Sequence, residues 1–118
     1  MAKFVFVLSA GLENSSKPTR CMQFAQIAKE DGHDVTIFLI DEGVIFGKKG
    51  MAQNIAAVTG DEMSTYLEFL TDEMVPILVC TPCARARQIG EDDLIENASL
   101  STGPVLIKLC AEGKVFNF

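Results

Sequence analysis

The sequence predicts a single α/β domain over residues 1–118, a three-layer α/β/α sandwich around a mostly parallel five-stranded sheet. Its 118 residues, 48% hydrophobic and 22% charged, are typical of one compact domain. Short, continuous apolar runs, typical of strands covered on both faces, alternate along the chain with amphipathic helical patterns. Such an alternation predicts βαβ units, which build parallel sheets with helices on both faces.

The first half of the chain predicts two strands with a helix between them. Residues 4–8 (FVFVL) and 35–40 (VTIFLI) are the buried strands. The helix begins near Pro18, after Ser15 and Ser16, and ends at residues 31–32 (DG). Helical spacing puts four residues on its apolar stripe: Cys21, Phe24, Ala25 and Ala28.

Residues 41–60 predict a long loop with one helical turn, because glycines at 43, 47 and 50 make the segment irregular around an apolar trio at 44–46 (VIF) that looks exposed. Thr59 or Asp61 is the expected cap of the next helix. That helix keeps a 3.6-residue apolar period through Met63, Tyr66, Leu67 and Leu70.

The second half predicts strands at 77–80, 98–100 and 115–118, with helices at 84–89 and 104–111. In a sheet of this kind, reactive groups gather outside the carboxyl ends of the strands. That rule directs attention to the end of the strand at 77–80.

Charge and cysteine content exclude several classes of protein. A net charge of −6 disfavours direct binding to nucleic acid. Apolar runs stay below the roughly 20 residues of a membrane span, and a buried first strand explains the signal-like residues 1–11. Four cysteines are too few for a secreted disulfide scaffold, so we expect reduced thiols and a cytoplasmic location.

The clearest chemical signal is the segment 77–87 (ILVCTPCARAR). Cys80 ends a predicted strand, and Thr81 is the expected N-cap of a helix that would place Cys80 and Cys83 at its N-terminus. Helix N-termini stabilise thiolates, and Arg85 and Arg87 would add positive charge there. The alternative is two buried structural thiols beside solvated arginines.

Other chemistry is poorly supported. A single CxxC supplies two of the four ligands of a structural zinc site, and the lone His33 is expected as a cap or surface residue, so no metal is expected. Residues 43–49 (GVIFGKK) depart from the phosphate-loop spacing, and no cofactor is expected. Cys21 and Cys110 lie on apolar helical stripes and are expected to pack in the core.

Several segments, taken in order, resemble one protein family. They are residues 24–26 (FAQ), 31–33 (DGH), 42–44 (EGV), Cys80 with Arg87 downstream, and the terminal 114–118 (KVFNF). Together they resemble the DsrE/DsrF-like sulfur-relay family, most closely its TusD-type branch, over nearly the whole chain.

This resemblance implies an α/β subunit that assembles as a homotrimer or homohexamer, or as a hetero-oligomer with paralogous subunits. It also implies an active cysteine that accepts persulfide sulfur from a donor protein and passes it to an acceptor protein. Cys80 occupies that position. Cys83 departs from the TusD-type pattern, which has a single cysteine here.

Three functional hypotheses follow. In the first, the protein is a sulfurtransferase-like persulfide carrier in which Cys80 holds the sulfur and Cys83 modulates or resolves that state. In the second, Cys80 and Cys83 form a CxxC dithiol/disulfide oxidoreductase couple. In the third, the chain is a non-catalytic oligomeric binding module, and residues 44–46 form subunit contacts.

Overall fold

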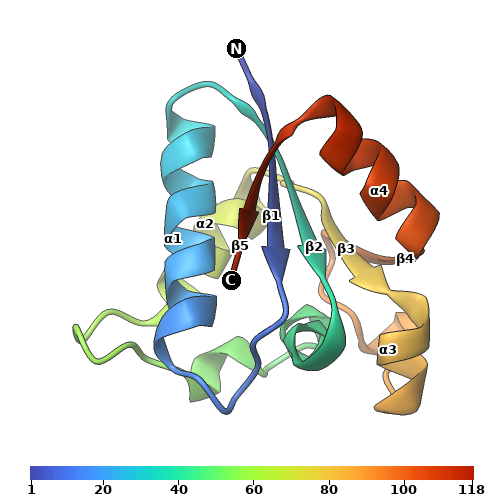
Figure 1. Cartoon of the computed structure of the whole chain (residues 1–118). Helices are drawn as coiled ribbons and strands as arrows, with labels where there is room; N and C mark the ends of the chain where they lie inside the picture. The colour runs from blue at the N-terminus through green and yellow to red at the C-terminus, as the bar shows by residue number, and fades with distance from the viewer.

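Five parallel strands form one sheet in the order β4-β3-β2-β1-β5 in the computed structural model, which describes residues 1–118 (Figure 1). The elements in chain order are β1 (Lys3–Leu8), α1 (Ser16–Glu30), β2 (Asp34–Leu39), the 3₁₀ segments η1 (Asp41–Gly47) and η2 (Ala52–Asn54), α2 (Met63–Asp72), β3 (Ile77–Cys80), α3 (Thr81–Ala86), η3 (Glu91–Asp93), β4 (Ala98–Ser101), α4 (Gly103–Glu112) and β5 (Lys114–Asn117).

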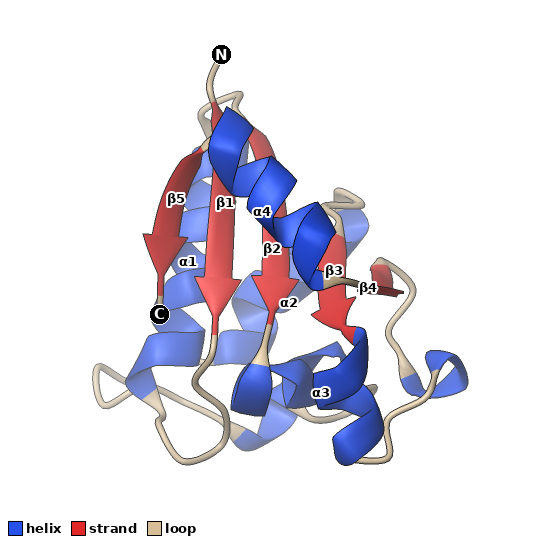
Figure 2. Cartoon of the chain, turned by 45° about the vertical axis from the view of Figure 1, so that its right-hand side comes forward, coloured by secondary structure: helices blue, strands red, loops and turns tan.

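The layers are those of the predicted sandwich. Figure 2 shows α4 in front of the sheet and α1 and α2 behind it, while α3 lies beyond the carboxyl ends of the strands. β1 pairs in parallel with β2 on one side and with β5 on the other, so Phe6 lies between Ile37 and Phe116. The prediction of an α/β fold with a parallel five-stranded sheet is therefore confirmed.

The main core lies between the sheet and the α1/α2 layer. Phe6 and Leu8 of β1 point into it and are 1% and 0% exposed. Cys21, on the facing side of α1, is 0% exposed, as predicted. Phe24 is 41% exposed, so its place on the buried stripe predicted for α1 is wrong. Met22 is buried in this helix instead.

The opposite layer is thin, because α4 contains no buried residue. Val105 is 41% exposed and Ile107 is 69% exposed, although both are large and apolar. Cys110 is half-buried, so the prediction that it packs in the core is wrong. The helix lies on the sheet in the single chain without closing over it.

Residues 41–60 are more ordered than predicted, since they contain η1 and η2. Val44 and Phe46 are 0% exposed and belong to the main core, while Ile45 is half-buried. The expectation that this apolar trio is an exposed contact surface is therefore wrong. The segment folds back under the carboxyl ends of the strands and fills the core there.

Two predicted helix caps are also wrong. The N-cap of α2 is Glu62 and that of α3 is Cys80, and neither makes a side-chain capping bond. The helix expected at 84–89 is α3, which begins earlier, at Thr81. The Thr81 hydroxyl donates instead to the Ser101 carbonyl oxygen at 2.7 Å and so ties α3 to the end of β4. Each helix in the chain falls short of the length and apolar content that crossing a membrane requires.

Candidate functional site

Cys80 is the last residue of β3, whose carboxyl end lies at the lower edge of the sheet next to α3 in Figure 2. It pairs in register with Ser101, the last residue of β4. On the other side of β3, the chain leaves β2 through Ile40 and enters η1 at Asp41. The edge therefore brings Cys80 close to the start of η1.

Gly43 holds η1 against the end of β1. A Cβ atom at this position would lie 2.2 Å from the Leu8 carbonyl oxygen, so only glycine permits the approach. The Ile40 amide donates to the same Leu8 oxygen at 3.0 Å, and the Gly43 amide donates to the Ile40 carbonyl at 2.9 Å. These contacts fix the backbone of Asp41, which lies between the two anchored residues.

The two thiols at this edge, Cys80 and Cys83, are both free and half-buried. The Cys83 thiol donates a long hydrogen bond to Asp41 Oδ1, with an S···O distance of 3.8 Å. Burial raises the pKa of Cys83 above its ordinary value, and a hydrogen bond with Cys80 raises it further. Both effects disfavour a Cys83 thiolate, whereas the position at the start of a helix was expected to favour it. With six residues, α3 is a short helix.

The two arginines of the motif have different surroundings. Arg87 donates to the Cys83 carbonyl oxygen at 3.0 Å and forms an ion pair with Glu42. Beside this pair is a hollow of about 230 Å³, lined by Leu12, Glu13, Glu42, Ile45 and Arg87. Arg85 lines a separate hollow with the acidic residues of η3. Arg87 is thus the arginine that contacts the thiol segment.

Sequence reasoning missed Asp41 and Glu42 as members of this site. Both follow β2 directly, and the carboxyl ends of parallel strands share one edge. The rule that led to Cys80 at the end of the third strand would have identified Asp41 and Glu42 had it been applied to the end of the second strand.

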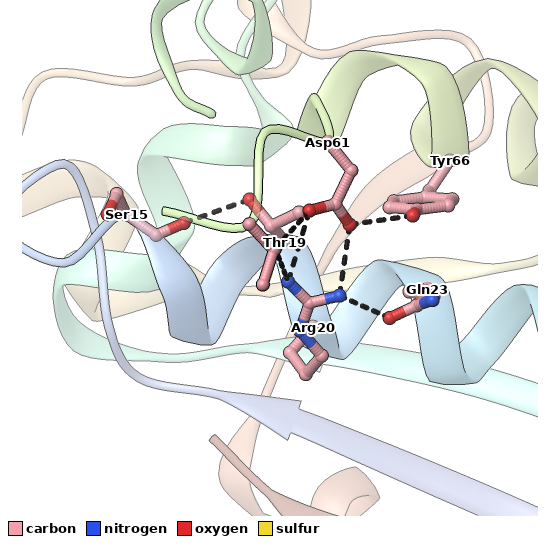
Figure 3. A network of polar contacts seen from close by, with 7 residues as sticks. Ser15, Thr19, Arg20, Gln23, Asp61 and Tyr66 are labelled. Carbon is pink, nitrogen blue, oxygen red and sulfur yellow. Dashed lines mark hydrogen bonds and ion pairs between the residues drawn. The ribbon is translucent and has the colours of Figure 1, made fainter. Parts of the chain in front are cut away.

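A separate polar network joins α1 to the start of α2 (Figure 3). Arg20 forms an ion pair with Asp61 at 2.9 Å, and the Tyr66 hydroxyl donates to Asp61 at 2.7 Å. The hydrogen bond from Arg20 holds the pKa of Asp61 well below its usual range, and Thr59 and Tyr66 act in the same direction. Asp61 therefore joins two helices, and the prediction that Asp61 or Thr59 caps α2 is wrong.

The most apolar hollow lies away from the thiols, between α1 and β5. It has a volume of about 410 Å³ and is lined by Phe4, Phe6, Phe24, Ile27, Ala28, Asp31, His33 and Phe116. His33 Nδ1 accepts a hydrogen bond from the Ala2 amide at 3.0 Å, at the amino ends of the strands.

Nowhere in the chain do three or more His, Cys, Asp or Glu side chains gather in a way that could hold a metal ion.

A parallel α/β subunit with a free cysteine at the carboxyl end of its third strand is the class of protein that these features define. The model of the DsrE/DsrF-like family matches residues 2–118, so the chain belongs to that family, which is generally associated with sulfur relay. The resemblance noted from the sequence is thereby confirmed.

Relatives and solved structures agree with this assignment. The chain is similar to the uncharacterized protein MJ0989 of Methanocaldococcus jannaschii, with 34% identity over 93% of each chain. The uncharacterized protein MK0008 of Methanopyrus kandleri is 36% identical over 81% of this chain and 76% of its own length. Among solved structures, the ychN protein of E. coli superposes with a TM-score of 0.83, at 26% identity, over all of both chains. MTH1491 of Methanobacterium thermoautotrophicum, a protein of unknown function, covers both chains fully with a TM-score of 0.72 at 17% identity and shares the fold.

Proposed function

We propose that the protein is a cytoplasmic persulfide carrier in which Cys80 accepts sulfur from a donor protein and passes it to an acceptor protein. Membership of the DsrE/DsrF-like family supports this proposal. The observation that carries it is the position of Cys80, a free, partly accessible thiol at the carboxyl edge of the sheet. A carrier needs such a thiol, because both partners must reach it.

The transfer balances without an external oxidant. The Cys80 thiolate attacks the outer sulfur of a donor persulfide, and the donor leaves as a thiolate as its S–S bond breaks. A new S–S bond then joins the transferred sulfur to Cys80. An acceptor thiolate repeats the attack on that sulfur and releases the Cys80 thiolate unchanged.

Neighbouring groups have supporting roles in this proposal. Thr81 holds the start of α3 to β4 through Ser101. Arg87 supplies positive charge to the anionic persulfide when its half-exposed partner Glu42 releases it. Arg85 adds a longer-range positive charge, because it lines a different hollow.

Intact-mass analysis after incubation with a persulfide donor tests the carrier proposal. The wild-type protein is expected to gain one sulfur atom, and Cys80→Ser is expected to gain none. Cys110→Ser, which removes a half-buried thiol from α4, is the matched control and should gain sulfur as the wild type does. Equal gain of sulfur by Cys80→Ser and the wild type would exclude Cys80 as the carrier.

A dithiol/disulfide couple is the second candidate, favoured by the hydrogen bond between the side chains of Cys80 and Cys83. Its test is the reduction potential of the pair. A potential far below that of the cytosolic thiol pool would leave the pair permanently oxidised and exclude a working redox couple.

We also propose that the chain assembles as a homotrimer or homohexamer, or with paralogous subunits, through α4 and β5. The exposed apolar side chains Val105 and Ile107 of α4 and Val115 of β5 support this choice of surface. Light scattering should therefore give a mass above that of one chain at micromolar concentration. Ile107→Arg should lower that mass, while Val58→Arg, at a 90% exposed loop position, should not. A monomeric wild type would refute assembly.

A further inference from the structure

Asp41 contacts Cys83 in two ways from a backbone conformation that is unusual for its residue type. Its φ of 49° lies in the left-handed region, which residues other than glycine seldom adopt. Its carboxylate lies 3.8 Å from Cys83 Sγ, and its backbone amide donates a hydrogen bond to the same thiol. One residue thus presents both a negative charge and an N–H donor to Cys83.

These two contacts favour different forms of the thiol. The amide hydrogen bond favours a Cys83 thiolate, whereas the negative charge of the carboxylate disfavours it. Burial is the largest cause of the raised pKa of Cys83, the hydrogen bond with Cys80 is the next, and the charge of the Asp41 carboxylate is the smallest. A substitution of the Asp41 side chain can therefore remove the effect of the carboxylate on the pKa of Cys83 and leave the contact of the backbone amide in place.

The other charged groups around Cys83 largely cancel. Glu42 of η1 is paired with Arg87 of α3, which also donates to the Cys83 carbonyl. Arg85 of α3 lines a separate hollow, and β3 contributes Cys80. Asp41 forms no ion pair, because the three in the chain involve other acidic residues. Its charge is thus the unpaired one that faces Cys83.

We propose that Asp41 is a positioning residue that keeps Cys83 as a neutral thiol and so protects sulfur carried on Cys80 from release. This inference rests on the proposed carrier function. The reaction that it suppresses is attack of a Cys83 thiolate on the Cys80 sulfur of the persulfide. That attack forms a Cys80–Cys83 disulfide and expels hydrosulfide, so the carried sulfur is reduced while the two cysteines are oxidised.

Asp41→Asn removes the charge and retains the shape and the backbone amide. Cys83 should then ionise at lower pH, because the repulsion between the carboxylate and the thiolate is gone. The thiolate fraction of Cys83 at neutral pH should therefore rise. Loss of carried sulfur as sulfide should accelerate with it.

The first experiment needs no sulfur loading. The rate of Cys83 alkylation is measured against pH in Cys80→Ser and in Cys80→Ser with Asp41→Asn. The variant with Asp41→Asn should reach its half-maximal rate at lower pH than Cys80→Ser alone. Asp72→Asn, at the end of α2 near the amino ends of the strands, removes the same charge elsewhere and should leave the profile unchanged. Identical pH profiles of Cys83 alkylation in Cys80→Ser with and without Asp41→Asn would overturn the proposal.

The second experiment follows sulfide release and disulfide formation after the protein is loaded with inorganic polysulfide. Asp41→Asn should release sulfide faster than the wild type at neutral pH. Adding Cys83→Ser should abolish the difference. Unchanged release from a loaded Asp41→Asn protein would overturn the protective role even if the alkylation profile shifts. Failure of the wild type to load any sulfur would instead refute the carrier function, while the alkylation profile still reports on Asp41.

Discussion

Replacing Gly43 with alanine tests whether the close contact between η1 and β1 builds the site. The new Cβ would lie 2.2 Å from the Leu8 carbonyl oxygen and 2.9 Å from its carbonyl carbon, both backbone atoms that no rotamer change can move. The two segments must separate by about 1 Å, and overpacking of this kind costs about 1–3 kcal/mol. Separation also weakens the 3.0 Å bond from the Ile40 amide to Leu8, worth about 1 kcal/mol. We expect the free energy of unfolding to fall by about 3 kcal/mol.

Urea unfolding, monitored by circular dichroism, measures this change in the free energy of unfolding. The slope of the transition is compared between variants. Gly103→Ala is the matched control, because a Cβ there meets no atom within 4 Å, and its stability should change by less than about 1 kcal/mol. The displaced η1 should also alter the alkylation rate of Cys83, since Asp41 moves with it. A Gly43→Ala protein within about 0.5 kcal/mol of the wild type would refute the contact.

Three further outcomes are expected. Phe46→Ala should lower the free energy of unfolding by about 3–5 kcal/mol in chemical denaturation, because Phe46 is fully buried; a loss below about 1 kcal/mol would contradict its place in the core. Cys21→Ser should cost about 1–3 kcal/mol, since it buries a hydroxyl at a 0% exposed site, whereas Cys110→Ser should stay within about 0.5 kcal/mol; equal effects in thermal melts would argue against this difference. Asp61→Asn should be less stable than the wild type at pH 6. The folded pKa of Asp61 lies below its ordinary value of 3.8, so this stabilisation is present above that value and is lost as the pH falls through the folded pKa. The difference between the two proteins in denaturant melts should therefore shrink below about pH 4, and a difference independent of pH would rule out the ion pair with Arg20 as its source.

Much of the fold was predictable because buried parallel strands have a strong local signal. The apolar run that became β1 is unbroken from residue 4 to residue 8, the run that became β2 contains one polar residue, Thr36, and β3 was predicted with its observed bounds. The strand order was not predictable, since it depends on which edges pair after the chain has folded. The burial of Phe46 was missed for the same reason, because its partners lie far away in sequence.

The site was predictable in part. Cys80 stood out because it is a reactive residue type at the end of a predicted buried strand, and the structure also places it at the end of that strand. The environment of Cys83 was not predictable from the sequence. Its raised pKa arises from burial and from Cys80, and the neighbouring charge of Asp41 belongs to another segment. Local spacing indicates which groups are near a helix end, but it does not reveal what a distant loop places beside them.

The thin α4 layer has a consequence for how the chain holds together. A helix without a buried side chain gains little free energy from the rest of the isolated subunit. Its backbone amides should therefore exchange with deuterated solvent through local opening, faster than those of α1, whose side chains pack in the main core. If α4 is covered by a second copy, protection of those amides becomes dependent on protein concentration, which links the order of this helix to assembly.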